Sequence, residues 1–584
     1  MYEMLSTDSK GIYPTEQFVD RYEKIYQDLE IKNVEVTFEI PDGETEEEKE
    51  EETSKTFPIQ VKMDSIAGPI AFDYEATMVQ EEIEEDSYDW FLNWDPGFIF
   101  PELADGGEIG LEFEQPIRGQ IFDRNHFGLA VTEVIYNMGV VPERFGDNPD
   151  QEKQKIAEVL EMDVSSIDQA LSAGWVEPNL FVPLKVIPTT DEHEINKLLS
   201  ASGALTYQTT TGRIYPYGEA TAHLIGYVGN ITAEELEQVD QELYTANDVI
   251  GKRGLEQLFE ERLKGKKGVR IIAQYEDKQN VVIAEQPVEH GETINLTIDA
   301  ELQEDIYQNY NGEAGTTVAI NPKSGETLAL VSSPAFDPNK LAYGISQSDW
   351  IALQEDPKTP LVNRFAAKFS PGSTFKPVTS AIGLNLDVID PDEGMEINGL
   401  TWGKDDWGNY KVRRVSESNG PVDLSDALIR SDNIYFARKA IEIGSDAFVE
   451  GLTNFGFNQE LPFTYPIQQS TISTTGEIDR EILLADSGYG QGEIQMSSLH
   501  LATLYTAFLN DGDVLKPTLE TDEATGEVWI DNAMTPEHAQ FIKDTLRKVV
   551  SEPNGTARGA NDNRLQLSGK TGTAELKTSQ SEED

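Results

Sequence analysis

The stretch FAAKFSPGSTFKPVTSAIGL, residues 365–384, places Ser373 three positions before Lys376. Pro377 lacks an N–H and is tolerated only near the start of a helix, so a helix should begin close to Ser373. A serine and a lysine three residues apart then lie on one face of its first turn. The positive end of the helix dipole favours an alkoxide, so the pattern predicts a serine nucleophile with a lysine in reach.

A lysine can take the proton of a serine only when it is neutral. Its ordinary pKa is about 10.4, so roughly 4 to 5 kcal/mol must come from burial or from nearby cations. Helical spacing of Val378, Ala381, Ile382 and Leu386 predicts that the helix is buried. The alternative is an ordinary helix start, since Ser-x-x-Lys arises by chance about once or twice in a chain of this length.

Two further strings, each occurring once, could complete a site. Ser431–Asn433 (SDN) lies between two helical patterns and is predicted on a turn. Lys570–Gly572 (KTG) lies in the strand pattern LQLSGKTGTAEL, where glycines often mark the close approach of a ligand or of backbone. Taken alone, the first string would be an ordinary helix cap and the second an ordinary turn.

Composition excludes several kinds of chemistry. The chain has no cysteine, which excludes thiol catalysis, disulfides and zinc–thiolate sites, and its six histidines show no metal-ligand spacing. The sequence therefore predicts no metal site and no cofactor. With 106 acidic against 45 basic residues the formal net charge is −61, which argues against nucleic acid as a partner because phosphate contacts need clustered Lys and Arg.

The elements around these strings predict a chain of several domains. In the first 110 residues VEVTFEI and FPIQVKM read as paired strands, and the acidic run 44–52 between them reads as a solvated hairpin tip. The aromatic segment WFLNWDPGFIFPEL is predicted to form the core of this α+β unit. Residues 151–174 read as helical.

The third region carries the candidate site. Residues 293–310 read as a strand followed by an amphipathic helix, and residues 315–334 read as a hairpin about a Pro-Lys-Ser-Gly turn. Long helical patterns follow, and a strand is predicted again in RLQLSGKTGTAEL. Strands, then helices, then a closing strand predict an α/β sandwich whose sheet pairs distant segments.

The three strings occur in the order Ser373, Ser431, Lys570, which resembles the set shared by penicillin-binding proteins and serine β-lactamases. RGQIFDRNHFGLA is similar to the motif that opens the dimerisation domain of class B penicillin-binding proteins, and GLEQLF, LTIDAELQ and ADSGYGQGEIQMS are similar to other class B stretches. The first 110 residues resemble the NTF2-like domain of the low-affinity, methicillin-resistance-type subgroup. YDWFLNWDPGFIFPEL and VNRFAAKFSPGST support that subgroup.

The resemblance implies an α+β multidomain architecture. An NTF2-like α+β domain is expected over residues 1–112, an extended dimerisation domain over 113–292, and a penicillin-binding, β-lactamase-like α/β sandwich over 293–584. Members of the family begin with a cytoplasmic stub and one membrane helix, and they continue beyond KTG with further strands and a helix. We therefore expect that the membrane anchor is absent from this sequence, that the transpeptidase domain is incomplete at its C-terminus, and that the intact protein lies on the extracytoplasmic face of the membrane.

The resemblance also implies D,D-transpeptidation of peptidoglycan. Ser373 would attack the carbonyl of the penultimate D-Ala of a stem peptide, and Lys376 would take its proton. Ser431 would relay a proton to the leaving D-Ala near Lys570. Asn433 would hydrogen-bond the substrate amide.

The same resemblance assigns the remaining site residues. Lys570, Thr571 and Thr573 would hold the terminal carboxylate of the stem peptide. Backbone N–H groups of Ser373 and Thr573 would form the oxyanion hole. Lys570 would also supply the nearby cation that helps to keep Lys376 neutral.

The implied partners are peptidoglycan stem peptides and lipid-linked precursors, β-lactam antibiotics and proteins of the cell-wall synthesis complex. Two alternatives remain open at this point. One is a β-lactamase-like hydrolase or β-lactam sensor, although no convincing Glu-x-x-x-Asn segment for positioning a water lies between Ser431 and Lys570. The other is a catalytically idle cell-wall scaffold, which the intact set of candidate residues argues against.

Overall fold

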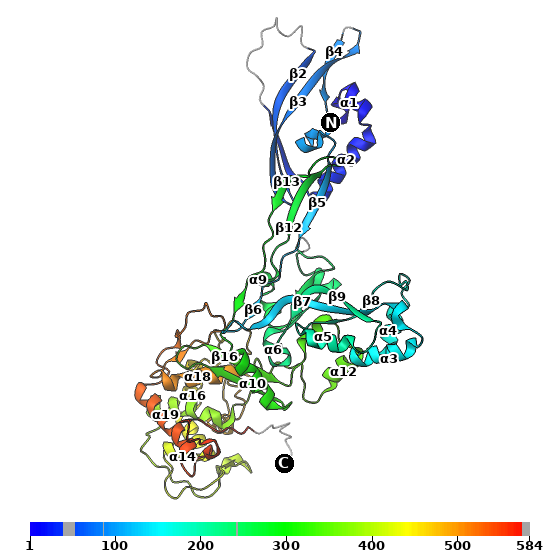
Figure 1. Cartoon of the computed structure of the whole chain (residues 1–584). Coiled ribbons are helices and arrows are strands. Elements are labelled where there is room, and N and C mark those ends of the chain that lie inside the picture. Colours follow the sequence, from blue (N-terminus) through cyan, green and yellow to red (C-terminus); the bar gives the residue numbers. More distant parts are fainter. Residues whose placement is uncertain (39–52, 86, 241–242, 575–584) are drawn as a thin grey trace. The chain divides into compact units, whose positions relative to one another are not determined.

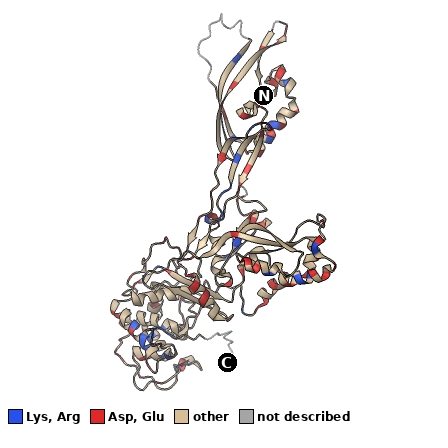
Figure 2. Ribbon diagram, viewed as in Figure 1, with Lys and Arg blue, Asp and Glu red and all other residues tan. Residues whose placement is uncertain are grey.

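The computed structural model describes residues 1–38, 53–85, 87–240 and 243–574 (Figure 1). The acidic run 44–52, predicted to be a hairpin tip, lies outside the described residues. The described chain divides into two compact units, which are Met1–Gly119 with Ala233–Thr245 and Glu261–Glu292, and Gln120–Thr232 with Ala246–Glu260 and Thr293–Asp584. Acidic side chains are spread along the described chain and are not confined to one segment (Figure 2).

The first unit is an antiparallel sheet with helices. Its strands have the order β1-β2-β3-β4 and are β1 (Lys32–Phe38), β2 (Ser54–Ser65), β3 (Gly68–Glu84) and β4 (Ser87–Asn93). Its helices are α1 (Thr7–Ile12) and α2 (Thr15–Asp28), and α7 (Ala233–Leu236) and α9 (Glu260–Lys264) come from later in the chain. Val36 of β1 pairs with Val61 of β2, so the predicted pairing of the first two strands is confirmed.

The core of this unit uses the predicted aromatic segment. Trp94, Phe100 and Leu103 are buried there, and the Trp94 ring lies 4.8 Å from the Phe18 ring of α2 in an edge-on arrangement. Burial of large aromatic side chains is the main favourable term in a small core. A second, three-stranded sheet of the unit has the order β13-β12-β5 and consists of β5 (Glu108–Glu114), β12 (Gly268–Gln274) and β13 (Val281–Gln286).

The second unit begins with a sheet built around one long strand. Strand β7 (Gly128–Val140) pairs with its neighbours on both sides, which are β6 (Ile121–Phe122), β8 (Val182–Ile187) and β9 (Leu205–Ile214). Helices α3 (Pro149–Val159) and α4 (Val164–Leu171) confirm the predicted helical segment 151–174. Shorter elements of this part are α5 (Glu192–Leu199), α6 (Ala222–Ile225), α8 (Gly254–Leu258), β10 (Val228–Asn230) and β11 (Val249–Gly251).

The part of the second unit that carries the candidate residues opens as predicted. A short strand, β14 (Ile294–Asn295), leads to α10 (Ala300–Tyr310), and the hairpin is β15 (Gly315–Ile320) with β16 (Thr327–Ser333). Gln303 joins helix α10 to strand β16 of the hairpin. Its Nε2 donates to Leu330 O (2.7 Å) and its Oε1 accepts from Leu330 N (2.7 Å). This bonding satisfies a buried amide and fixes the helix on the hairpin.

The rest of this part is mainly helical. Its helices are α11 (Pro338–Tyr343), α12 (Gln347–Glu355), α13 (Lys376–Asn385), α14 (Leu424–Arg430), α15 (Asn433–Ile443), α16 (Ser445–Asn454), α17 (Glu481–Ser487), α18 (Ser498–Tyr505) and α19 (Pro536–Ser551). Short strand pairs lie between them, namely β17 (Lys368–Phe369) with β20 (Met496–Ser497), β18 (Thr401–Trp402) with β19 (Val412–Arg413), and β21 (Val514–Leu515) with β22 (Val528–Ile530). Within the described residues, no helix combines the length and the apolar composition needed to cross a bilayer.

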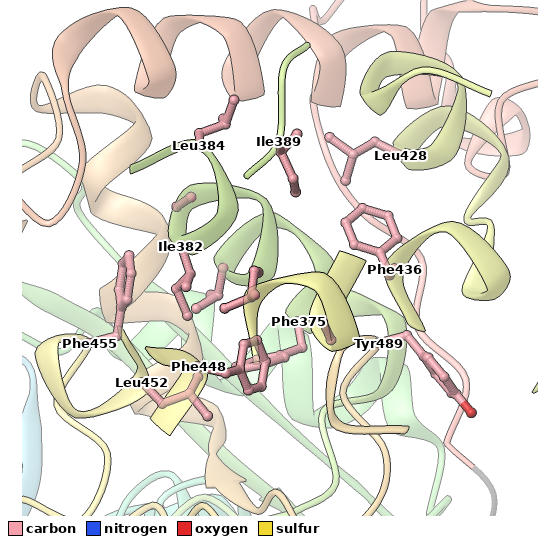
Figure 3. Packing of buried hydrophobic residues seen from close by; sticks show 14 of the residues in the cluster. Phe375, Ile382, Leu384, Ile389, Leu428, Phe436, Phe448, Leu452, Phe455 and Tyr489 are labelled. Carbon is pink, nitrogen blue, oxygen red and sulfur yellow. The ribbon is translucent and has the colours of Figure 1, made fainter. Parts of the chain in front are cut away.

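Helix α13 runs through the middle of the largest apolar cluster. Phe375, Ile382 and Leu384 pack there against side chains of the surrounding helices, among them Leu428 and Phe448 (Figure 3). The predicted burial of this helix is confirmed, with one exception. Leu386 is 45% exposed, because α13 ends at Asn385 and the next residue lies past the buried face.

The predicted closing strand is wrong for the residues that the structure describes. Residues 564–574 form no strand, and β15 pairs only with β16 in the described chain. The segment instead bonds to α19, where Gly569 N donates to Leu546 O (3.1 Å) and Arg547 donates to Leu567 O. An alternating pattern predicts that a segment can be extended, but it does not supply the neighbouring strand that a ladder needs.

Candidate active site

Ser373 lies on a tight turn that glycine makes possible. The turn is a 3-10 helix, Gly372–Phe375, which leads directly into α13. Gly372 has φ +54° and donates its N–H to Gly490 O (2.7 Å). A Cβ on Gly490 would lie 2.1 Å from Gly372 O, so only glycine allows this contact. The nucleophile turn is therefore held by backbone from the segment after α17.

Lys376 is the centre of a polar cluster inside an apolar core. Its side chain is fully buried. The side-chain nitrogen lies 2.9 Å from Ser373 Oγ, 3.0 Å from Ser431 Oγ, 2.9 Å from Ser431 O and 2.7 Å from Asn433 Oδ1. The spacing of three thus places serine and lysine in contact, as predicted, and the same nitrogen also reaches the distant SDN string.

Burial lowers the pKa of Lys376 well below its ordinary value, and the positive charge of Lys570 lowers it further. The carboxylate of Asp432 opposes these two effects. A neutral amine keeps a lone pair, which can accept the Ser373 proton. The surroundings of Lys376 therefore favour its neutral form, which is the form that a lysine must have to act as the base.

The SDN string forms the predicted turn between two helices. Helix α14 ends at Arg430, Ser431 adopts a left-handed conformation with φ +59°, and Asp432 caps the start of α15. Asp432 Oδ1 accepts from Ile434 N (2.9 Å) and from Tyr435 N, which satisfies free N–H groups of the first helical turn. This geometry turns the Ser431 hydroxyl toward Lys376.

Lys570 completes a line of polar contacts. Its nitrogen lies 2.8 Å from Ser431 Oγ and 2.9 Å from Thr571 O. Burial lowers its pKa to about 8, so it still carries most of its charge at neutral pH. Ser373, Lys376, Ser431 and Lys570 thus form one continuous hydrogen-bonded series along which a proton can move.

The two threonines of the string occupy different places. Thr571 Oγ1 donates to Thr556 Oγ1 (2.8 Å), so this side chain is engaged with a neighbouring loop. Thr573 is exposed, and its backbone lies against the nucleophile turn: a Cβ on Gly372 would be 2.4 Å from Thr573 O. The structure therefore brings all seven predicted site residues to the same region.

Three residues that no motif marked also hold this region in place. Arg414 pairs with Asp432, Gly490 accepts from the nucleophile turn, and Thr556 binds Thr571. Only Gly490 had a signal in the sequence, because it lies in the glycine-rich string SGYGQG. Arg414 lies in KVRRVSES, which shows no periodicity that would have marked it.

Three parts of the chain match known families of protein domains. Residues 315–584 match the penicillin-binding protein transpeptidase domain, residues 113–296 the penicillin-binding protein dimerisation domain, and residues 1–107 the NTF2-like N-terminal transpeptidase domain. The chain belongs to the class B penicillin-binding proteins and has their three-domain architecture. The expected membership of the class B penicillin-binding proteins and the expected fold class are confirmed.

Individual relatives agree with this assignment. The chain is 41% identical to penicillin-binding protein 3 of Bacillus subtilis over 586 residues, which is 100% of this chain and 86% of the relative. It is 28% identical to the peptidoglycan D,D-transpeptidase MrdA of Escherichia coli K12, over 79% of this chain and 77% of the relative. A solved complex of PBP2 and MreC from Helicobacter pylori has the same fold, with a TM-score of 0.64, 22% identity, and coverage of 80% of this chain and 89% of that chain.

Family membership and the named relatives establish the reaction class. The protein is a serine-type peptidoglycan D,D-transpeptidase that acts on peptidoglycan and binds β-lactams. The expected function and enzyme class are confirmed, and the comparisons give no better support to a hydrolase, a sensor or an idle scaffold.

Proposed function

We propose that Ser373 is the acylated nucleophile and that Lys376 is its base. The observation that carries this assignment is the position of Lys376 Nζ, which touches Ser373 Oγ and Ser431 Oγ from a fully buried site. Ser373 Oγ bonds to the carbonyl carbon of the penultimate D-Ala as its proton passes to Lys376. The C–N bond to the terminal D-Ala then breaks.

The proton reaches the leaving amine through Ser431. Ser431 Oγ lies within hydrogen-bond distance of both lysine nitrogens, so it can receive the proton from Lys376 and pass it on beside Lys570. The acceptor amine of a second stem peptide then attacks the ester, and Ser373 recovers its proton. A β-lactam opens by the same first step, but its amine stays tethered and no group leaves.

The remaining residues bind and polarise the substrate in this proposal. Asn433 hydrogen-bonds the substrate amide, and Lys570, Thr571 and Thr573 hold the terminal carboxylate. The N–H groups of Ser373 and Thr573 form the oxyanion hole, which contributes about 3 kcal/mol per donor. The backbone of Gly572 and Thr573 lies beside the nucleophile turn, which brings the two residues of this proposed pair close together.

We also propose that the domain boundaries lie at residues 112 and 292 and that the protein belongs to the low-affinity, methicillin-resistance-type subgroup. The NTF2-like match over residues 1–107 supports this subgroup.

We propose a cellular setting as well. The protein works on the extracytoplasmic face of the membrane, on stem peptides of lipid-linked precursors, together with other cell-wall synthesis proteins. The solved neighbour, a PBP2 in complex with MreC, supports such a partner.

A donor-exchange assay tests the proposed function. The protein is incubated with a stem-peptide mimic ending in D-Ala-D-Ala and with a labelled D-amino acid as acceptor. We expect release of D-Ala and formation of the exchanged peptide, neither of which Ser373→Ala should produce. Release of D-Ala by Ser373→Ala at the wild-type rate would overturn the assignment, as would rapid turnover of benzylpenicillin without exchange.

The rate of acylation should also depend on pH through Lys570. Above pH about 8 this lysine loses its proton, and with it the charge that holds the substrate carboxylate. We therefore expect acylation by benzylpenicillin to decline as pH rises through about 8. Lys570→Arg keeps the charge over this range. Its alkaline decline should move upward by more than one pH unit, and an unmoved decline would show that another group causes it.

A further inference from the structure

A buried ion pair lies directly behind the SDN turn. Arg414 Nη1 donates to Asp432 Oδ2 (2.8 Å), and both side chains are 1% exposed. The remaining nitrogens of Arg414 donate to Gly399 O (Nε, 2.9 Å) and Ile397 O (Nη2, 3.0 Å). A buried pair of this kind is costly to desolvate and is no evidence for stability by itself, so another role is to be sought.

The position of the pair suggests that role. Asp432 lies between the two residues that contact Lys376, since Ser431 offers its carbonyl and hydroxyl and Asn433 its amide oxygen. The other oxygen of Asp432 caps α15, so both carboxylate oxygens are held in place. The Asn433 amide in turn donates to Arg413 O (2.9 Å), which ties the loop carrying Arg414 to the same cluster.

Two charged groups bear on the Lys376 nitrogen from neighbouring elements, and a third group is paired with one of them. Lys570 approaches from the segment after α19, and its positive charge disfavours a protonated Lys376. Asp432 approaches from the start of α15, and its negative charge favours a protonated Lys376. Arg414 lies on the segment that follows β19 and is paired with Asp432.

We propose that Arg414 is a positioning residue that neutralises Asp432, so that Asp432 can shape the SDN turn without forcing a proton onto Lys376. The turn needs a carboxylate or an equivalent acceptor to cap α15, but a lone negative charge beside the general base would keep that base protonated. Arg414 resolves this conflict by pairing with the carboxylate inside the protein, where charges act strongly. This inference rests on the proposed role of Lys376 as the base.

The test is a cycle of charge-changing variants. The variants are Arg414→Gln, Asp432→Asn and the double variant, and the measured quantity is the rate of acylation by benzylpenicillin from pH 5 to 9. Because neutral Lys376 is the active form, this rate rises with pH through the pKa of that lysine. Asparagine caps a helix as well as aspartate does, so Asp432→Asn removes the charge and retains the cap.

The expected shifts have opposite signs. Arg414→Gln leaves Asp432 uncompensated, which should move the acidic limb of the profile upward by about one pH unit and reduce acylation about tenfold at pH values on the rising part of the wild-type limb. Asp432→Asn leaves the positive charge of Arg414, which should move the limb downward by about one unit. The double variant restores the balance, and its limb should return to within about half a unit of wild type.

A purely structural role would give a different pattern. Loss of packing slows acylation in all three variants without opposite shifts of the limb, and that result would overturn the inference. Glu256→Gln serves as the matched control, because Glu256 also forms a buried ion pair with an arginine, Arg213, and should leave the limb in place. Absence of acylation in the wild-type protein at every pH would instead contradict the proposed function.

Discussion

Lys376→Ala is expected to reduce the rate of Ser373 acylation by benzylpenicillin by about 10³- to 10⁴-fold near pH 7.5. Lys376 is the group whose nitrogen lies 2.9 Å from Ser373 Oγ, and its pKa is lowered by burial and by Lys570. Without it the serine must lose its proton to water or to a more distant group. The measurement is the pseudo-first-order rate of adduct formation, followed by intact-protein mass spectrometry.

Lys439→Ala is the matched control for this variant. Lys439 is also a buried lysine of the same helical region, but its nitrogen is bonded to Glu442 (2.8 Å) and Val388 O, away from the site. The rate of Ser373 acylation in Lys439→Ala should lie within about twofold of the wild-type rate, because this change leaves the reacting groups in place. Acylation of Lys376→Ala at more than a tenth of the wild-type rate would contradict the account and point to Ser431 with Lys570 as the base.

Ser431→Ala should give the second largest effect, a loss of about 10²- to 10³-fold in D-Ala release. Its hydroxyl is the link between Lys376 (3.0 Å) and Lys570 (2.8 Å), so its removal interrupts the proton series. Alanine and serine have similar difficulty with the left-handed backbone at this position, so the turn should persist. The rates of D-Ala release and of β-lactam acylation are measured together.

The comparison of these two rates decides the role of Ser431. Release of D-Ala needs a proton on the leaving amine, and we expect it to suffer at least as much as acylation. Ser487→Ala is the control, because this buried hydroxyl has no hydrogen-bond partner among the described residues and lies on α17. Wild-type rates of both reactions in Ser431→Ala would show that the proton takes another route.

Local features of the site could be predicted because they depend on few neighbours. A proline placed at the second position of α13 set the start of that helix, and the spacing of three then brought Lys376 to Ser373. The hairpin of β15 and β16 followed from its turn and two apolar runs. These are short-range rules, and each was confirmed.

Features that depend on distant segments could not be predicted. Arg414 reaches Asp432 across 18 positions, and Gly490 lies far along the chain from the turn that it holds. No periodicity records such a pairing, because the partners meet only when the helices pack. The prediction of a strand around Lys570 was wrong for the same reason, because an alternating pattern does not specify which strand would pair with it.

The central claim is that Ser373 forms a long-lived acyl-enzyme, and peptide mapping of the benzylpenicillin adduct tests it most directly. The protein is mixed with the drug, digested, and searched by mass spectrometry for a peptide that carries the whole drug. We expect the adduct on the peptide containing Ser373, a lifetime of many minutes, no adduct in Ser373→Ala, and an unchanged adduct in Ser370→Ala, which changes a neighbouring serine whose hydroxyl binds Gly490 O (2.9 Å). An adduct on a different serine, or one on Ser373 that clears within seconds, would contradict the account.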